Sequence, residues 1–188
     1  MKCRTRQERF LQARERLYQI IHDEVCVNRI SLGLGMFGKP FLEGSPHFFD
    51  FSMSYGQEHF AIAISCSTDI GVDLEDSFPQ EPVPSFTAIC SPREFFLLNK
   101  YKKQDLLNIW VRKEAFLKMN GVGLMVDPRE VEVDQQQRAL YIGNQSLSYN
   151  EARLEVNRTE QLFTVAMAFP STADSGMTVE FITDSSPN

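Results

Sequence analysis

The chain has 188 residues, 43% hydrophobic and 23% charged, so it carries enough apolar material for a folded core and is not disordered throughout. Its 25 acidic and 19 basic residues give a net charge of −6, which argues against a surface that binds nucleic acid generally. The length fits one domain or two small lobes.

The sequence also bears on the compartment. No stretch reaches the roughly 18 consecutive apolar residues that a membrane span needs. Residues 1–10 carry positive charges with no apolar run behind them, unlike a secretory signal. The four cysteines are far apart and form no Cys-x-x-Cys pair, which predicts reduced thiols. We therefore expect a cytoplasmic protein that acts without nucleic acid or a membrane. A monomer is expected for a separate reason, because the two lobes predicted below belong to one chain.

One long helix and then short strands are predicted for the first half. Apolar residues recur at helical spacing over residues 6–27, which predicts an amphipathic helix. Beyond residue 30, glycine and proline separate β-like runs, and strands are expected at 48–54, 59–65 and 70–75. Residues 76–90 contain three prolines and are predicted to be a linker.

The second half repeats this order. Ser91 and Glu94 form a capping box at the start of a helix to about residue 101, and a second helix is expected over 105–120. Strands are predicted at 130–134, 138–142, 152–157 and 161–169. Helix followed by strands thus occurs twice, which predicts two similar α+β lobes, 1–85 and 86–170, followed by a flexible tail, 171–188.

The segment Gly71-Val72-Asp73-Leu74-Glu75 is the first candidate for chemistry. In a strand, Val72 and Leu74 point into the core, while Asp73 and Glu75 share the opposite face. Two such carboxylates repel each other unless a cation lies between them, and hard oxygen ligands suit magnesium or manganese. The alternative is an exposed strand edge that carries two solvated acids.

The second candidate lies on the helix predicted at 105–120. Trp110, Glu114 and Lys118 are four residues apart and form one stripe. The stripe is either a surface with an ordinary Glu–Lys pair, or one wall of a site. In a site, Glu114 completes a three-carboxylate magnesium centre and Lys118 holds a phosphate.

These motifs, in this order, resemble the surfactin-synthetase type of 4′-phosphopantetheinyl transferase. That family's signature is a Gly-x-Asp-x-Glu strand and a Trp-x-x-Lys-Glu-Ala/Ser-x-x-Lys helix, found here at residues 71–75 and 110–118. Gly38-Lys39-Pro40 also agrees, as does Phe49-Asp50-Phe51-Ser52-Met53-Ser54, where the family usually has Phe-Asn-x-Ser-His-Ser. The resemblance extends from about residue 5 to residue 169.

The resemblance implies the phosphopantetheinyl transferase fold, two lobes related by pseudo-twofold symmetry with coenzyme A between them. It implies a Mg²⁺ site, with Mn²⁺ as a substitute, at Asp73, Glu75 and Glu114. It implies coenzyme A contacts at Lys39, Ser52, Lys118, the Met53 position and Arg9. Asp73, Glu114 and Lys118 would then be the catalytic residues, and Lys113 matches the first lysine of the motif, whose role is left open.

This sequence departs from the family pattern in two ways. Met53 replaces the motif histidine, and a thioether neither donates a hydrogen bond nor carries charge. The chain also begins at the first long helix, so the fold is expected to be shortened at the N-terminus. Both departures weaken the nucleotide contacts rather than the metal site.

The implied reaction transfers phosphopantetheine from coenzyme A to a serine of an apo acyl or peptidyl carrier protein and releases 3′,5′-ADP. Either Glu114 or a metal-bound water would take the serine proton. Lys100, Lys102, Lys103 and Arg112 form a candidate docking patch for an acidic carrier, or a solvated charge run. The alternative function is a non-catalytic descendant of the fold that binds coenzyme A or a carrier; another magnesium-dependent pyrophosphate enzyme is a third.

Overall fold

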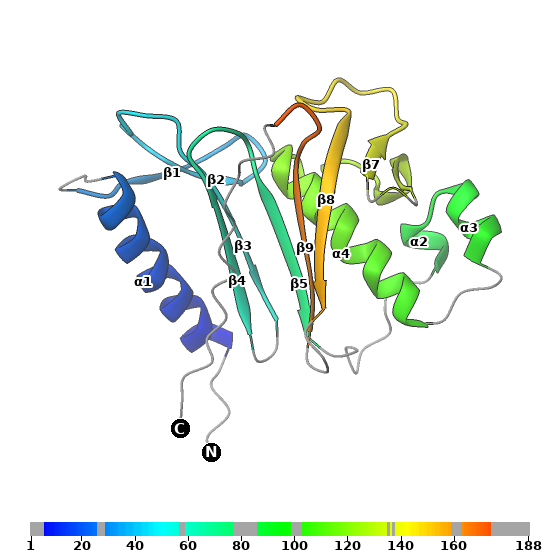
Figure 1. Cartoon of the computed structure of the whole chain (residues 1–188), viewed down its shortest axis with the longest axis horizontal. Coiled ribbons are helices and arrows are strands. Elements are labelled where there is room, and N and C mark those ends of the chain that lie inside the picture. Colours follow the sequence, from blue (N-terminus) through cyan, green and yellow to red (C-terminus); the bar gives the residue numbers. More distant parts are fainter. Residues whose placement is uncertain are drawn as a thin grey trace, which may run out of the picture.

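The computed structural model describes residues 6–25, 29–56, 59–76, 86–98, 103–134, 136, 138–158 and 163–173, which form an α+β fold (Figure 1). Its helices are α1 (Arg6–Val25), α2 (Phe86–Ile89), α3 (Pro92–Leu98) and α4 (Lys103–Met119), with 3-10 turns η1 (Gly123–Met125) and η2 (Pro128–Glu130). Its strands are β1 (Leu32–Leu34), β2 (Pro40–Leu42), β3 (Asp50–Tyr55), β4 (Phe60–Ser65), β5 (Gly71–Asp76), β6 (Val131–Val133), β7 (Arg138–Tyr141), β8 (Glu151–Arg158) and β9 (Phe163–Pro170).

In the first half, α1 covers one face of the antiparallel β3–β4 hairpin (Figure 1). The buried stripe Ala13, Leu17 and Ile21 packs on the large apolar side chains of the two strands, such as Phe51 and Ile62. Because strand side chains alternate, the opposite face of the hairpin carries small and polar residues: Asp50, Ser52, Ser54, Ala61 and Ala63. That face lies toward β5, since Ala61 and Ala63 share a core cluster with Val72 and Leu74.

The second half is an antiparallel five-stranded sheet in the order β5-β9-β8-β7-β6, with α4 packed across one face. β5 belongs to the first half of the sequence but pairs with β9, so the sheet joins the two halves. On the face toward α4, β5 and β9 present Gly71, Ala166 and Ala168, which leave room for the helix. A Cβ on Gly71 would lie 2.0 Å from the Ala115 carbonyl oxygen, so the backbones of β5 and α4 are in close contact.

The predicted elements agree with the structure closely. The long first helix, the three strands predicted before residue 76, the two helices after residue 91 and the four final strands are all present, with ends within three residues of the predicted ones where described. Strands β1 and β2 were not predicted individually. The capping box is confirmed, because the Ser91 amide donates to Glu94 Oε2 and the Glu94 amide donates to Ser91 Oγ. The predicted linker at 76–90 contains the short helix α2, and its residues 77–85 lie outside the described part.

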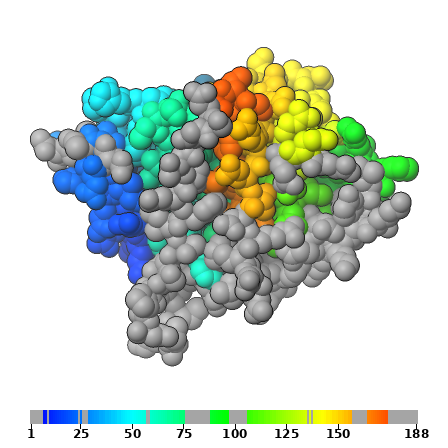
Figure 2. All heavy atoms as spheres, in the orientation of Figure 1, coloured from blue at the N-terminus to red at the C-terminus, as the bar shows by residue number. Residues whose placement is uncertain are grey.

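Helices α1 and α3 lie toward opposite ends of the molecule, with β9 between them (Figure 1, Figure 2). The division into lobes at residue 85 and their pseudo-symmetry stay predictions, and the tail beyond residue 173 lies outside the described residues. In the described part, no helix is both long and apolar enough to cross a membrane.

Candidate active site

The centre of the candidate site is Asp73, on the face of β5 that α4 covers. Its Oδ1 accepts hydrogen bonds from Ser54 Oγ on β3, at 2.8 Å, and from Lys118 Nζ on α4, at 2.6 Å. The predicted alternation is confirmed, with Val72 and Leu74 in the core on the other face. Asp73 is only 5% exposed, so it is not a solvated acid on an open edge. Three elements therefore converge on one buried carboxylate.

Glu114 lies one helical turn before Lys118 and faces the same region. Its burial, together with the nearby charges of Asp73 and Glu75, raises the pKa of Glu114 to about 7, and Lys118 opposes this rise. The structure thus brings together the four charged side chains that the two sequence motifs contributed. The ion pair of Lys118 with Asp73 on β5 means that the charged stripe of α4 is not an isolated surface Glu–Lys pair.

Two carboxylate oxygens in this group are unusual. Asp73 Oδ2 and Glu114 Oε1 are both buried and accept no hydrogen bond. A buried acceptor without a partner costs about 1–3 kcal/mol, more when charged, so such atoms need an explanation. A cation between the acids would supply the missing partner.

The donor set fits magnesium or manganese, which favour carboxylate oxygens. Within the described residues, however, no three His, Cys, Asp or Glu side chains are already gathered at metal-binding spacing. Instead the Lys118 ammonium holds Asp73, and 27% of the lysine side chain is exposed. The fit rests on the two unpartnered oxygens and on the chemistry of Asp73, Glu75 and Glu114, which would be the ligands.

Ser52 and Met53, the two expected coenzyme A contacts on β3, point to opposite faces of that strand. Ser52 Oγ accepts a hydrogen bond from the Val72 amide at 3.0 Å, on the side of the site. Met53 packs with the α1 core, where its sulfur accepts a hydrogen bond from Tyr55 Oη at 3.2 Å. The structure therefore does not bring the Met53 side chain to Asp73.

Lys39 and Arg9 complete the expected set. Lys39 Nζ donates to Asp50 Oδ2 at 2.6 Å, and to the carbonyl oxygens of Ile70 and Met119. The side chain of Arg9 lies outside the described part of the structure, as do the side chains of the lysines of the docking patch.

Sequence reasoning missed two residues of β3, Ser54 and Asp50. Both share a strand face with Ser52, so period-two alternation from Ser52 was a signal that could have found them. Ser54 holds Asp73, and Asp50 holds Lys39.

Lys113, whose role the sequence left open, is fully buried behind the site. Its Nζ donates to Glu94 Oε2 at 2.5 Å and to the carbonyl oxygens of Ile89 and Pro128. Desolvation lowers the pKa of Lys113, and the Glu94 charge opposes that change. Its hydrogen bonds tie α4 to α2, α3 and η2, which is a structural role.

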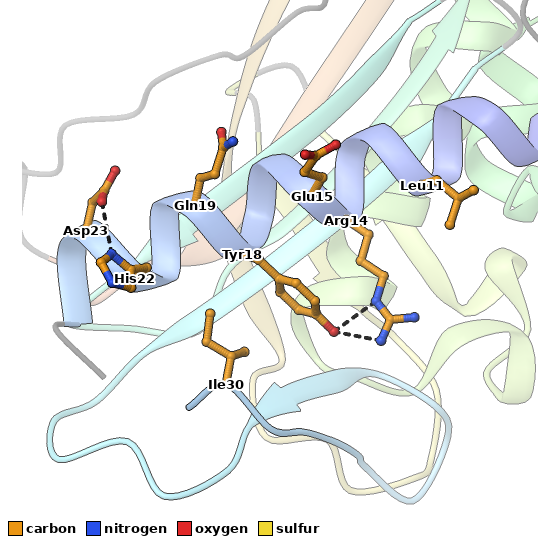
Figure 3. A pocket seen from close by; sticks show the side chains of 8 residues that line it. All are labelled: Leu11, Arg14, Glu15, Tyr18, Gln19, His22, Asp23 and Ile30. Carbon is orange, nitrogen blue, oxygen red and sulfur yellow. Dashed lines mark hydrogen bonds and ion pairs between the residues drawn. The ribbon is translucent and has the colours of Figure 1, made fainter. Parts of the chain in front are cut away.

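A surface hollow of about 660 Å³ lies elsewhere, between α1 and Ile30 (Figure 3). Arg14 and Tyr18 are among the α1 side chains that line it, and they are hydrogen-bonded to each other. None of the predicted site residues whose side chains the structure describes lines this hollow. The candidate chemistry is therefore separate from it.

The sequence motifs and the fold together define a class of protein. A family model described as the 4′-phosphopantetheinyl transferase superfamily matches residues 69–166, just over half of the 188-residue chain. The chain belongs to this superfamily, and its α+β fold is that of the family. The matched segment includes Asp73, Glu114 and Lys118.

Two relatives are similar to the chain, both named L-aminoadipate-semialdehyde dehydrogenase-phosphopantetheinyl transferase. The Saccharomyces cerevisiae protein is 32% identical over 104 residues, which are 50% of this chain and 38% of the relative. The Rattus norvegicus protein is 26% identical over 150 residues, which are 74% of this chain and 47% of the relative. The chain thus spans less than half the length of either relative.

Proposed function

We propose that the protein transfers 4′-phosphopantetheine from coenzyme A to a serine of an apo carrier protein, with release of 3′,5′-ADP. The observation that carries the proposal is the group of Asp73, Glu114 and Lys118, in which two buried carboxylate oxygens are unpartnered, in a chain of this superfamily. We further propose that the reaction depends on magnesium and that the protein acts as a cytoplasmic monomer.

Each residue of the group has a proposed task. Asp73, Glu75 and Glu114 would hold Mg²⁺, which when bound would neutralise the pyrophosphate and stabilise negative charge on the departing 3′,5′-ADP. Lys118, whose side chain is partly exposed, would turn its ammonium toward the phosphates. Ser52 lies on the same side of β3 and would donate its hydroxyl to a phosphate oxygen.

We propose that Glu114, directly or through a water, takes the proton of the carrier serine. It lies one turn from Lys118 on α4 and has a buried oxygen without a hydrogen-bond donor. A carboxylate that accepts this proton must lie within about 2.6–3.2 Å of the serine hydroxyl, or reach it through one water. The carrier would therefore present its serine over the α4 side of the site.

The intact mass of an apo carrier protein, after incubation with this protein, coenzyme A and magnesium, tests the proposal. We expect a gain of one phosphopantetheine group, absent with Asp73→Ala or with a chelator, and unchanged with Glu155→Ala, an exposed acid on β8. Since the relatives are named for L-aminoadipate-semialdehyde dehydrogenase, its apo form belongs in the panel beside fatty-acid, polyketide and peptide-synthetase carriers.

Two outcomes would overturn the assignment. Turnover retained in Asp73→Ala would reject the metal site. Coenzyme A binding without transfer to any carrier would favour a non-catalytic binding protein, an alternative motivated by Met53 in place of the motif histidine. Met53→His would then be the first variant to test for recovered transfer.

A further inference from the structure

Lys39 has no spare hydrogen-bond donor in this structure. It lies at the turn before β2, and its ammonium has three acceptors: Asp50 Oδ2 at 2.6 Å, the Ile70 carbonyl at 3.1 Å and the Met119 carbonyl at 3.3 Å. An ammonium group has three N–H donors, so all are engaged. The side chains of Lys39 and Asp50 are 17% and 10% exposed, which leaves this pair largely out of water.

The acceptors belong to three different parts of the fold. Asp50 begins β3, and its Oδ2 also accepts the Ile70 amide at 2.7 Å. Ile70 immediately precedes β5, and Met119 is the last residue of α4. The Met119 carbonyl belongs to the last helical turn, where carbonyls lack helical partners and a cation is favoured. One ion pair therefore fastens the start of β5 and the end of α4 to β3.

The site depends on how these two ends meet. Gly71, next to Ile70, is in contact with the α4 backbone, since an added Cβ would lie 2.4 Å from the Met119 nitrogen. Lys118 precedes Met119 and holds Asp73, two residues beyond Gly71, at 2.6 Å. A small shift of the helix end would therefore change the Asp73–Lys118 contact directly.

We infer that Lys39, paired with Asp50, is a positioning residue that sets α4 against β5 and so fixes the arrangement of the candidate site. This role rests on the proposed function only where metal binding is concerned. It differs from the role that the motif implies, in which Lys39 contacts a phosphate directly. To bind a phosphate, Lys39 would first have to leave Asp50.

Asp50→Asn separates the two roles, because it removes the negative charge and keeps the side chain's size. If Lys39 contacts phosphate, the released ammonium should bind inorganic pyrophosphate more tightly. If Lys39 is a positioning residue, pyrophosphate affinity should not increase, and the end of α4 should loosen. Arg153→Met, which removes an exposed cation on β8, is the control.

The experiment measures hydrogen exchange and Mn²⁺ affinity of the full chain without coenzyme A. We expect Asp50→Asn and Lys39→Met to increase exchange in the peptides covering the end of α4 and the start of β5. We expect both to weaken Mn²⁺ binding by about tenfold, as is usual when the support of metal ligands is removed. Lys39→Arg, which keeps the charge, should retain much of the Mn²⁺ affinity that Lys39→Met loses. If Lys39→Met does not fold, Lys39→Arg and Asp50→Asn are compared instead.

Unchanged exchange at both segments in Asp50→Asn, or tighter pyrophosphate binding by that variant, would overturn the inference. If the unmodified protein binds no Mn²⁺, the metal site of the proposed function fails instead. Hydrogen exchange and pyrophosphate binding then still decide the role of Lys39.

Discussion

Two ion pairs on α4, the buried Lys113–Glu94 pair and the partly buried Lys118–Asp73 pair, differ in how completely their hydrogen-bonding groups are satisfied. Lys113 has three acceptors, and its partner Glu94 accepts backbone amides on both oxygens in addition to the lysine. In the pair of Lys118 and Asp73, the second donor contact of the lysine is long, 3.5 Å to the Met53 carbonyl, and Asp73 Oδ2 has no partner. The neighbouring Glu114 also has an unpartnered buried oxygen.

This difference separates structure from chemistry. A fully hydrogen-bonded buried pair has no capacity left for a ligand, and removing either member leaves an uncompensated charge. A group with an unpartnered buried oxygen, by contrast, becomes more stable when a further donor or a cation binds to that oxygen. Lys113 and Lys118 are five residues apart on α4. Lys113 nevertheless stabilises the packing of α4 on α2, α3 and η2, whereas Lys118 faces the candidate site.

The largest effect should come from breaking the satisfied pair. Lys113→Met leaves Glu94 buried without its cation, so we expect a loss of about 3–5 kcal/mol in the free energy of unfolding. Chemical denaturation of the variant and of Arg129→Met, which breaks an exposed pair with Asp127, gives the comparison. A loss as small as that of the control would mean that the buried pair contributes no more than a surface one.

The second effect concerns the contact that brings Asp73 to α4. Gly71→Ala forces a Cβ against the α4 backbone, so we expect about 1–3 kcal/mol of destabilisation, together with weaker Mn²⁺ binding. Gly44→Ala is the matched control, because Gly44 has a φ of 70° but open space around it. It should lose stability through backbone strain alone and keep its Mn²⁺ affinity; equal losses of affinity would show that crowding at β5 is not the cause.

Most of the fold followed from local patterns. Alternation in β5 predicted that Asp73 and Glu75 share a face, and four-residue spacing in α4 predicted that Glu114 and Lys118 share a stripe. That the two motifs meet was implied by the family resemblance, and the structure brings Asp73 to Lys118 and near Glu114. Local patterns do not identify the hydrogen-bond and ion-pair partners of a charged side chain. Lys39 was assigned to phosphate from its motif, whereas its actual partners Asp50, Ile70 and Met119 are up to 80 residues away in sequence.

The separation of Ser52 from Met53 illustrates the same limit. Adjacent residues in one motif were both expected at coenzyme A, but strand geometry sends neighbouring side chains to opposite faces. Once β3 is known to be a strand covered by α1 on one side, the methionine belongs to the α1 core and Ser54 to the site. Long-range packing, rather than motif membership, decides these positions.

The smallest effect, and the one that best defines the unsatisfied group, is the pH dependence of Glu114. Burial and the charges of Asp73 and Glu75 raise its pKa to about 7 from the usual 4.5, against the pull of Lys118. The folded state therefore binds the proton more tightly than the unfolded state, so stability is lost as pH rises from about 4.5 to about 7. Glu114→Gln, which stays neutral, should lack this loss.

The unmodified protein and Glu114→Gln should thus be equally stable near pH 4. At pH 8 the free energy of unfolding of Glu114→Gln should be higher by about 2 kcal/mol. A fully buried carboxyl with the same pKa shift would give roughly 3 kcal/mol, and Glu114 is only partly buried. Thermal unfolding across this pH range measures the gap. Magnesium at pH 8 should narrow it, because a bound cation stabilises only the ionised carboxylate. A gap that does not change with pH would show that Glu114 is not strained by its neighbours, and the distinction between the two ion pairs would then rest on Asp73 alone.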